Sequence, residues 1–145
     1  MAVGFGQTFR VNIMNWVFGK GAPTTPAGVL WVSLHTADPG VDGQTANEAT
    51  GTGYAAVAVV AAGWNNPTAA QPSVVTNNGA ITFPTAGGDW SSAATFTHFG
   101  LWNHATLRTA ANFVHRGTIT TPQAVLNGNT PSFATTVLQA TLDQV

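Results

Sequence analysis

Apolar and mixed side chains alternate along residues 29–35, directly before a turn sequence. The aliphatic positions are Leu30, Val32 and Leu34, and between them stand Trp31, Ser33 and His35. Such alternation is typical of a strand with one face in the core. Pro39 has no amide proton and Gly40 tolerates a positive φ, so the strand should end in a tight turn. We predict a half-buried strand on which the other elements pack.

Residues 7–18 show the different spacing of an amphipathic helix. Apolar side chains recur at Phe9, Ile13, Trp16 and Val17, which are positions i, i+4, i+7 and i+8 of one helical face. The glycine and proline that follow favour an end to the helix there. We expect this apolar stripe to pack on the strands, and the alternative is an arm that docks on a neighbouring subunit.

The remaining sequence alternates between short apolar runs and turn residues. Further strands are predicted at residues 54–61, 73–75, 80–83, 95–103, 112–118 and 135–142. Short strands separated by turns about every 8–12 residues are typical of antiparallel sandwiches. We therefore predict a mainly β single domain over residues 1–145, in which an antiparallel β-sandwich or jelly roll (29–143) carries one short N-terminal amphipathic helix (7–18).

Local sequence also predicts how some of these strands are placed. The small apolar run at 54–61 should be a central strand. An Asn-Gly pair at 78–79 should close a hairpin between the two strands that flank it. Thr-Pro at 121–122 should form a turn, and Trp90 should lie exposed or half-buried in a loop.

Charged residues are unusually rare in this chain. Asp, Glu, Lys and Arg make up 6% of the residues, against about 25% in an average soluble domain. The formal net charge is −1, so copies of the chain repel one another little. We expect part of the surface to be buried in a larger assembly, and the alternative is a charge-poor monomer.

The same composition argues against several partners. The four basic residues are scattered and form no patch for nucleic acid. No apolar run approaches the roughly 18 residues of a membrane span, and the N-terminus lacks the pattern of a secretory signal. Cysteine is absent from the sequence, which excludes disulfides and cysteine-based zinc sites. We expect no cofactor, no nucleic acid and no membrane contact.

A polar loop at residues 37–53 contains Asp38, Asp42 and Glu48. The two aspartates match positions 1 and 5 of an EF-hand loop, but Gly40 stands at position 3 and the final glutamate comes one residue early. Turn formation explains the same residues, so no metal is expected. Catalytic motifs are missing. We expect no enzyme, the alternative being a hydrolase whose carboxylate pair comes from distant loops.

Histidine and tryptophan side chains lie on strand faces opposite the aliphatic ones. Trp31 and His35 share one such face, and His98 and Trp102 share another. Hydrogen bonding in polar pockets or at subunit contacts explains the histidines better than a metal site does. Aromatic side chains in these positions favour an interface, although a second layer over the sheet would bury them equally well.

Taken together, these segments resemble a family of short tailed-bacteriophage virion proteins. That family combines an N-terminal helix and a Pro-containing connector with a strand reading LHTADPG, an Asn-Glu pair, GGY, F…THFGIW and a final T-L-D. The corresponding residues here are 34–40, 47–48, 53–54, 97–102 and 141–143. The resemblance covers nearly the whole chain. It departs at Thr52, where the family has Gly, and after Tyr54, where Ala replaces an expected basic residue.

The resemblance implies a non-enzymatic structural role in the virion. The leading hypothesis is a capsid decoration or cement protein, a homo-oligomer such as a trimer, which stabilises contacts between major capsid subunits. Its partners would be the major capsid protein or other virion proteins. The expected contact residues are Phe9, Ile13, Trp16, Trp31, His35, Asp38, Asp42, Glu48, His98 and Trp102. The alternative is a tail, neck or fibre component that contacts the host surface, with Trp64, Trp90 and polar loops binding glycan.

Overall fold

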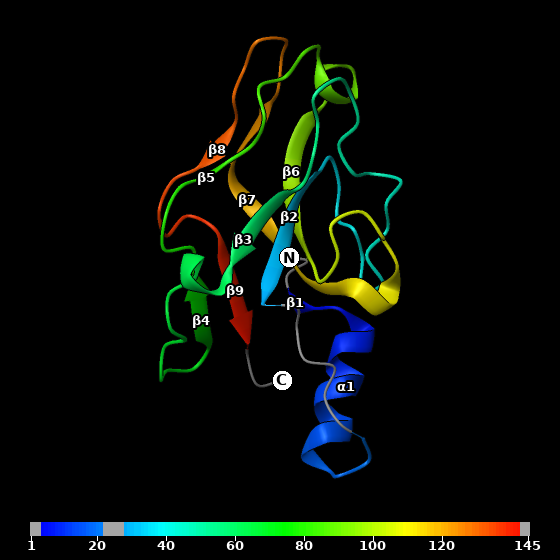
Figure 1. Cartoon of the computed structure of the whole chain (residues 1–145), viewed down its shortest axis with the longest axis vertical. Coiled ribbons are helices and arrows are strands. Elements are labelled where there is room, and N and C mark those ends of the chain that lie inside the picture. Colours follow the sequence, from blue (N-terminus) through cyan, green and yellow to red (C-terminus); the bar gives the residue numbers. More distant parts are fainter. Residues whose placement is uncertain (1–3, 22–27, 143–145) are drawn as a thin grey trace.

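The computed structural model describes residues 4–21 and 28–142, which form mainly antiparallel β structure with one helix near the N-terminus (Figure 1). This confirms the predicted fold class, a small β-sandwich with one N-terminal helix. The elements in chain order are β1 (Gly4–Phe5), α1 (Gln7–Val17), β2 (Val29–His35), β3 (Val57–Val60), η1 (Ala61–Gly63), β4 (Ser73–Thr76), β5 (Ile81–Thr82), η2 (Trp90–Ala93), β6 (Thr95–Trp102), η3 (Ala110–Asn112), β7 (Phe113–Ala124), β8 (Ser132–Phe133) and β9 (Gln139–Leu142).

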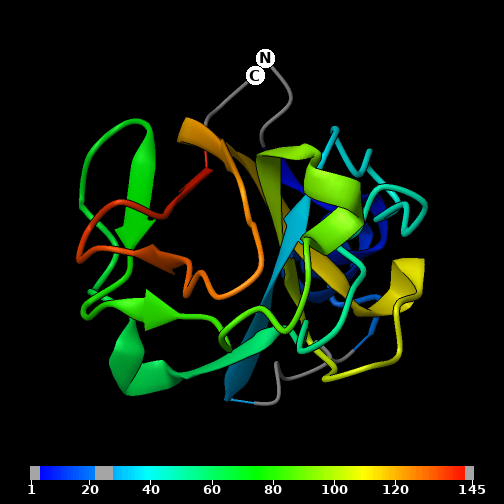
Figure 2. The ribbon, with the colours of Figure 1, turned by 90° about the horizontal axis from the view of Figure 1, so that it is seen from above.

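Five strands form the main sheet in the order β1-β7-β6-β2-β3, and all neighbouring strands are antiparallel. The strand pairs β4-β9 and β5-β8 form two smaller sheets. Figure 2 shows both small sheets on one side of the main sheet, with α1 and the long loops on the other side. The main sheet is therefore covered on both faces.

The apolar core fills the space between the main sheet and the small sheets. Leu34 of β2 lies opposite Phe99 of β6, and both are buried. The Phe99 ring meets Phe133 of β8 edge to face with 6.3 Å between centroids, and Phe133 meets Phe83 in the same way at 6.1 Å. These rings join the main sheet and the β5-β8 sheet in one buried cluster.

From Val32 to His35 the opposite face of β2 is buried as well, so the prediction of a half-buried strand is wrong there. Ser33, His35 and Trp102 have no exposed surface. The long loop after β2 (36–56) covers them at Gly43, which has a φ of +67°. A Cβ atom there would lie 2.6 Å from the Phe113 ring and 2.7 Å from the Trp102 ring. The backbone of the loop thus touches the sheet directly, as only glycine allows.

Strand pairing differs from prediction in two places. β3 lies at the edge of the main sheet rather than at its centre. β4 and β5 form no hairpin, because β4 pairs with β9 and β5 pairs with β8. Between them Asn77 is buried, and its side chain bonds to backbone groups of Ala134 and Leu138. These long-range bonds replace the local turn that an Asn-Gly pair usually favours.

Two local predictions are also corrected. Trp90 is fully buried, and its Nε1 donates a 3.0 Å hydrogen bond to the carbonyl of Thr52. Pro122 lies inside β7 rather than in a turn. One edge of β7 is paired by β1 only at His115 and Arg116. A residue without an amide proton is tolerated farther along that edge, since no described strand needs its hydrogen bond there.

Candidate functional site

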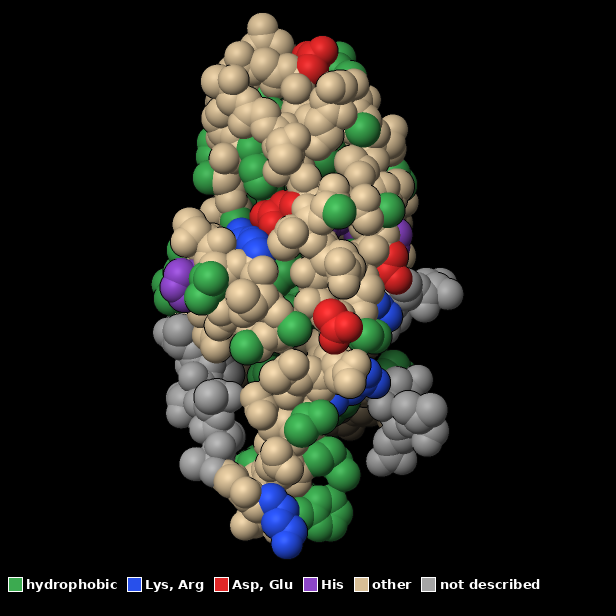
Figure 3. Space-filling model, turned by 90° about the vertical axis from the view of Figure 1, so that its right-hand side faces the viewer, with side chains coloured by type: hydrophobic (Ala, Val, Ile, Leu, Met, Phe, Trp, Pro, Cys, Tyr) green, Lys and Arg blue, Asp and Glu red, His purple; other side chains and the backbone are tan. Residues whose placement is uncertain are grey.

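Helix α1 projects beyond the end of the sheets instead of lying across them (Figure 1). Large apolar side chains on the helix and its C-cap are between 51% and 65% exposed: Val11, Met14, Trp16, Val17 and Phe18. Figure 3 shows hydrophobic side chains gathered over the lower end of the molecule, where α1 lies. The prediction that this stripe packs on the strands holds at Phe9, which packs against the core. It is wrong for Trp16 and Val17, which are exposed. The alternative of an arm that docks on a neighbouring subunit stays a prediction.

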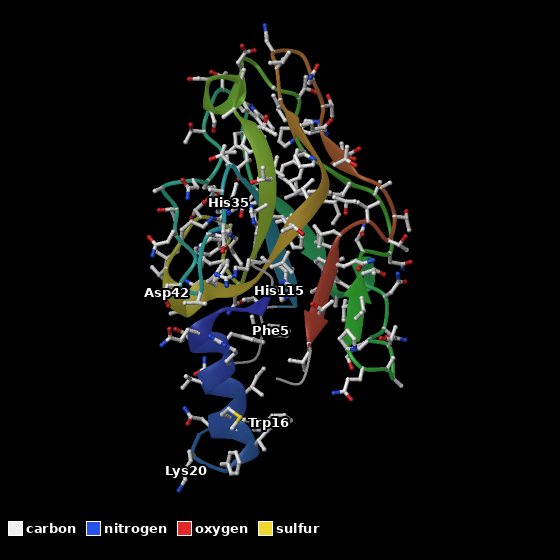
Figure 4. The ribbon with its side chains drawn as sticks, turned by 180° about the vertical axis from the view of Figure 1, so that it is seen from behind. Phe5, Trp16, Lys20, His35, Asp42 and His115 are labelled. Carbon is white, nitrogen blue, oxygen red and sulfur yellow. The ribbon has the colours of Figure 1, made fainter. Side chains whose placement is uncertain are left out.

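Among the described residues, the start of α1 is fixed to the body of the protein by stacking and by backbone hydrogen bonds. The rings of Phe5 and Phe9 stack with 5.2 Å between their centroids. The amide of Gly6 donates to the carbonyl of Val114, and the amide of Gln7 donates to the carbonyl of Val41, both at 2.9 Å. Figure 4 shows Phe5 at the base of the helix, Trp16 farther out and Lys20 at the free end. The apolar residues thus sit on a firmly mounted projection.

The charges on this projection have one sign. Arg10 and Lys20 are exposed, and neither lies within ion-pair distance of a described carboxylate. Residues 7–21 contain no Asp or Glu. The projection therefore suits a partner surface that is apolar and carries carboxylates, because such a surface would match both its side chains and its charge.

A groove of about 550 Å³ lies between the long loop after β2 and the loop after β6. Trp31 and Tyr54 contribute aromatic rings to its lining, and Glu48 and Arg108 contribute a charged pair. The rest of the lining is alanine and threonine. The groove thus joins aromatic, charged and hydroxyl groups in one place.

Glu48 and Arg108 form the best-bonded charged pair of the described residues. The Nε of Arg108 donates to both carboxylate oxygens of Glu48 at 3.2 Å, and its Nη1 donates to the carbonyl of His104 at 2.7 Å. The guanidinium lies 4.9 Å from the centre of the Trp102 ring. The Tyr54 hydroxyl donates to Glu48 at 3.1 Å. Burial, followed by the Glu48 charge, raises the pKa of Tyr54 above its usual range, so this hydroxyl remains a donor.

Removing the charge at this pair should cost measurable stability. Both side chains are 12% exposed, so the partner of a deleted charge remains largely desolvated. We expect the double-mutant cycle of Glu48→Gln and Arg108→Gln to give a coupling energy of about 1–2 kcal/mol in urea unfolding.

The matched control is the pair of Asp38 and Arg116. Its shortest distance is 3.4 Å, and its aspartate is 34% exposed. We expect a coupling energy below about 1 kcal/mol there, because solvent screens the charges. Equal coupling energies for the two pairs would contradict the structural distinction between them.

A chain of hydrogen bonds runs from this groove into the protein. Behind the Arg108 guanidinium, the Nε1 of Trp102 donates to the Ser33 hydroxyl at 2.7 Å. That hydroxyl lies 2.8 Å from Nε2 of His35. Burial, with smaller effects of the Arg108 and His98 charges, lowers the pKa of His35 to about 4. The ring is therefore neutral at pH 7.

The structure distributes the expected contact residues over several regions. Phe9, Ile13 and Trp16 lie on α1, Trp31 and Glu48 line the groove, and His35 and Trp102 are buried behind it, whereas Asp38, Asp42 and His98 lie elsewhere on the body. Burial of His35 and Trp102 by loops of their own chain excludes a subunit contact through these side chains. That part of the expected interface is wrong, while the exposed members remain a prediction.

The acidic residues of the long loop are held apart from one another. Asp38 accepts a hydrogen bond from the Gly40 amide and faces Arg116. Glu48 faces Arg108, and Asp42 is exposed. Across residues 4–21 and 28–142, no group of three or more His, Cys, Asp or Glu side chains is placed to hold a metal ion. Asp38 therefore serves a turn and an ion pair, and Glu48 serves an ion pair.

Two residues that define the groove, Tyr54 and Arg108, were not predicted from the sequence. Arg108 is one of only four basic residues and Tyr54 is the single tyrosine, which was a usable signal for paired polar groups. The tryptophans expected to bind glycan are placed differently. Trp90 is buried, and Trp64 is half-buried with its indole nitrogen enclosed and unpartnered within the described structure.

Comparisons with known proteins identify the family of this chain. No helix in the described ranges has the length and hydropathy needed to cross a membrane. The curated proteins include no match. Residues 4–141 match the family model described as podophage GP4 fiber I protein gp80. This match supports a bacteriophage virion structural protein, and it fits the tail or fibre alternative better than capsid decoration. The chain therefore belongs to the podophage GP4 fiber I protein gp80 family.

Proposed function

We propose that this chain is a non-enzymatic component of the fibre apparatus of a tailed bacteriophage, attached to another virion protein through α1. The observation that carries the proposal is the family match over residues 4–141. It favours the fibre alternative over the capsid decoration role that the sequence suggested first. The projecting apolar helix supplies a physical means of attachment.

Attachment through α1 is supported by the way this helix is mounted. Helices with apolar side chains around most of their circumference are normally buried. Here five such side chains stay exposed although the base of the helix is fixed on β7 and the long loop. A partner with an apolar surface and nearby carboxylates would cover these side chains and match the charges of Arg10 and Lys20.

The location is tested by cryo-electron microscopy of virions that carry a small tag on this chain. Density for the tag on fibres at the tail is expected. Tag density ordered over the icosahedral shell would overturn the proposal and restore capsid decoration.

The attachment is tested by the double substitution Met14→Gln and Phe18→Gln. Both side chains are more than half exposed, so the free energy of unfolding should change by less than about 0.5 kcal/mol for each change. Incorporation into virions should fall about tenfold or more, because each change removes an interface anchor. Quantitative immunoblotting of purified virions measures this fall.

The matched control is Thr120→Gln with Thr121→Gln, two exposed positions on β7 away from α1. These changes should leave incorporation unchanged. Normal incorporation of the α1 variant would show that the helix is not the attachment surface.

A further inference from the structure

The groove beside Trp31 has no role in attachment through α1. We propose that it binds a neutral sugar ring of a bacterial surface polysaccharide. This inference rests on the proposed function, because a fibre location would bring the groove to the cell surface. The argument starts from the groups that line the groove.

Trp31 gives the groove an aromatic surface. Its side chain is half-buried, with Trp102 opposite it on β6 and Ala58 opposite it on β3. The face of an aromatic ring carries negative potential. It therefore attracts the partly positive C–H groups on the flat face of a sugar ring. Ala55 and Ala56 also line the groove, and their small side chains leave room for a flat ligand.

The charged pair of the groove is suited to hydroxyl groups. The charges of Glu48 and Arg108 cancel, which favours a neutral ligand over an anion. Arg108 uses Nε and Nη1 in its bonds to Glu48 and His104, and its Nη2 group makes none of these bonds. Glu48 can accept and Arg108 can donate, as two neighbouring hydroxyls of a sugar require.

These polar groups are fixed before any ligand arrives. Glu48 is held by Arg108 and Tyr54, and Arg108 is held over the Trp102 ring. Side chains that are already ordered lose little further freedom on binding. The threonines of the lining, Thr45, Thr50 and Thr106, add hydroxyls that can donate or accept.

Two other hollows in the described structure lack this combination. A second groove of about 550 Å³ beside β7 and β9 is lined by threonine, glutamine, valine and glycine, without an aromatic ring or a charge. A hollow of about 290 Å³ beside Trp64 is mainly apolar. Sites for small polar molecules typically pair an apolar surface with a few converging polar groups, and the groove at Trp31 has both.

The test measures binding of the full chain to surface polysaccharide purified from the bacterium that the phage infects. Biolayer interferometry with the immobilised polysaccharide should show saturable binding. Periodate treatment, which cleaves neighbouring hydroxyl pairs of sugars, should abolish it. Ala55→Arg fills the exposed rim of the groove without removing a buried contact, and it should raise the Kd at least about tenfold.

The matched control is Ala80→Arg, which adds the same side chain at an exposed alanine outside the groove. It should leave the Kd unchanged. Trp31→Ala, checked for folding by circular dichroism, should weaken binding to the same degree as Ala55→Arg. Agreement of these two groove variants would assign the site to the aromatic surface.

Three results would overturn the inference: no binding by the unaltered chain, binding that resists periodate, or equal Kd values for Ala55→Arg and Ala80→Arg. Density of another virion protein inside the groove would do so as well. A negative polysaccharide result would not change where the tag is found in the virion. Tag density on the capsid shell would refute the fibre proposal, whatever the polysaccharide result. The two proposals therefore fail separately.

Discussion

Acidification from pH 7 to pH 4 is expected to remove much of the stability of this fold through two buried histidines. His35 and His115 are 0% and 1% exposed. Burial, opposed in part by a backbone contact with Thr141 and reinforced by Arg116, lowers the pKa of His115 to about 4. Burial likewise lowers the pKa of His35 to about 4. Both imidazole rings are therefore neutral in the folded protein at pH 7.

The sign of the effect follows from proton uptake. Between pH 6.5 and pH 4 the unfolded chain binds protons at both histidines, whereas the folded chain does not. The free energy of unfolding is therefore unaffected by these two groups above about pH 6.5, and it decreases as the pH falls toward 4. Each histidine should account for about 3 kcal/mol of that loss, which is large against the usual 5–15 kcal/mol of a domain.

His115→Phe offers a sharp test, because the His115 ring already stacks on Phe99 with 6.4 Å between centroids and meets Phe5 edge to face at 5.0 Å. The variant should unfold in urea with a clearly smaller pH dependence than the unaltered chain. His104→Gln is the control, since His104 is exposed. If His115→Phe and the unaltered chain lost stability in parallel between pH 7 and pH 4, burial of this ring would not be the cause.

The second large effect is expected at Asn77. Its side-chain nitrogen donates to the carbonyls of Gly79 and Ala134 at 2.7 and 2.8 Å, and its oxygen accepts from the amide of Leu138 at 2.9 Å. Asn77→Ala should lower the free energy of unfolding by about 3 kcal/mol, because it removes three hydrogen bonds of a buried side chain and takes its acceptor away from the buried Leu138 amide. Urea unfolding followed by circular dichroism measures the change.

Asn78→Ala is the matched control for this variant. Asn78 is exposed, and its side chain makes one 3.3 Å bond to the carbonyl of Ala62. Its loss should cost less than about 0.5 kcal/mol. Similar costs for the two alanine variants would mean that Asn77 does not hold the small sheets in place.

The sequence predicted the local elements well where periodicity is strong. The helix expected at 7–18 is α1 (Gln7–Val17), and the alternation at residues 29–35 coincides with β2. The run at 95–103 corresponds to β6. Side-chain spacing reports backbone geometry directly, because a helix and a strand expose their faces with different periods. The motifs also pointed to a virion protein, and the family match supports that class.

The candidate site was only partly visible in the sequence. Trp31 and Glu48 were singled out, but their partners Tyr54 and Arg108 lie far along the chain from Trp31. The polar face of β2 was expected to lie in polar pockets or at subunit contacts, because its residues are tryptophan, serine and histidine. In the structure Ser33 and His35 are buried and Trp31 is half-buried. The loop backbone at Gly43 contacts the neighbouring Trp102 ring on this face. No local pattern encodes which distant segment will cover a strand face.

Sequence by itself therefore determined a mainly β chain with one N-terminal helix, its strongest strands and its poverty of charge. Tertiary structure alone decided that β3 lies at an edge, that β4 and β5 pair elsewhere, that both faces of β2 are buried from Val32 to His35 and that Trp16 and Val17 of α1 are exposed. The physical reason is the distance along the chain over which each property is determined. Backbone periodicity depends on neighbours within a few residues, whereas strand pairing and burial depend on contacts between segments far apart in the chain.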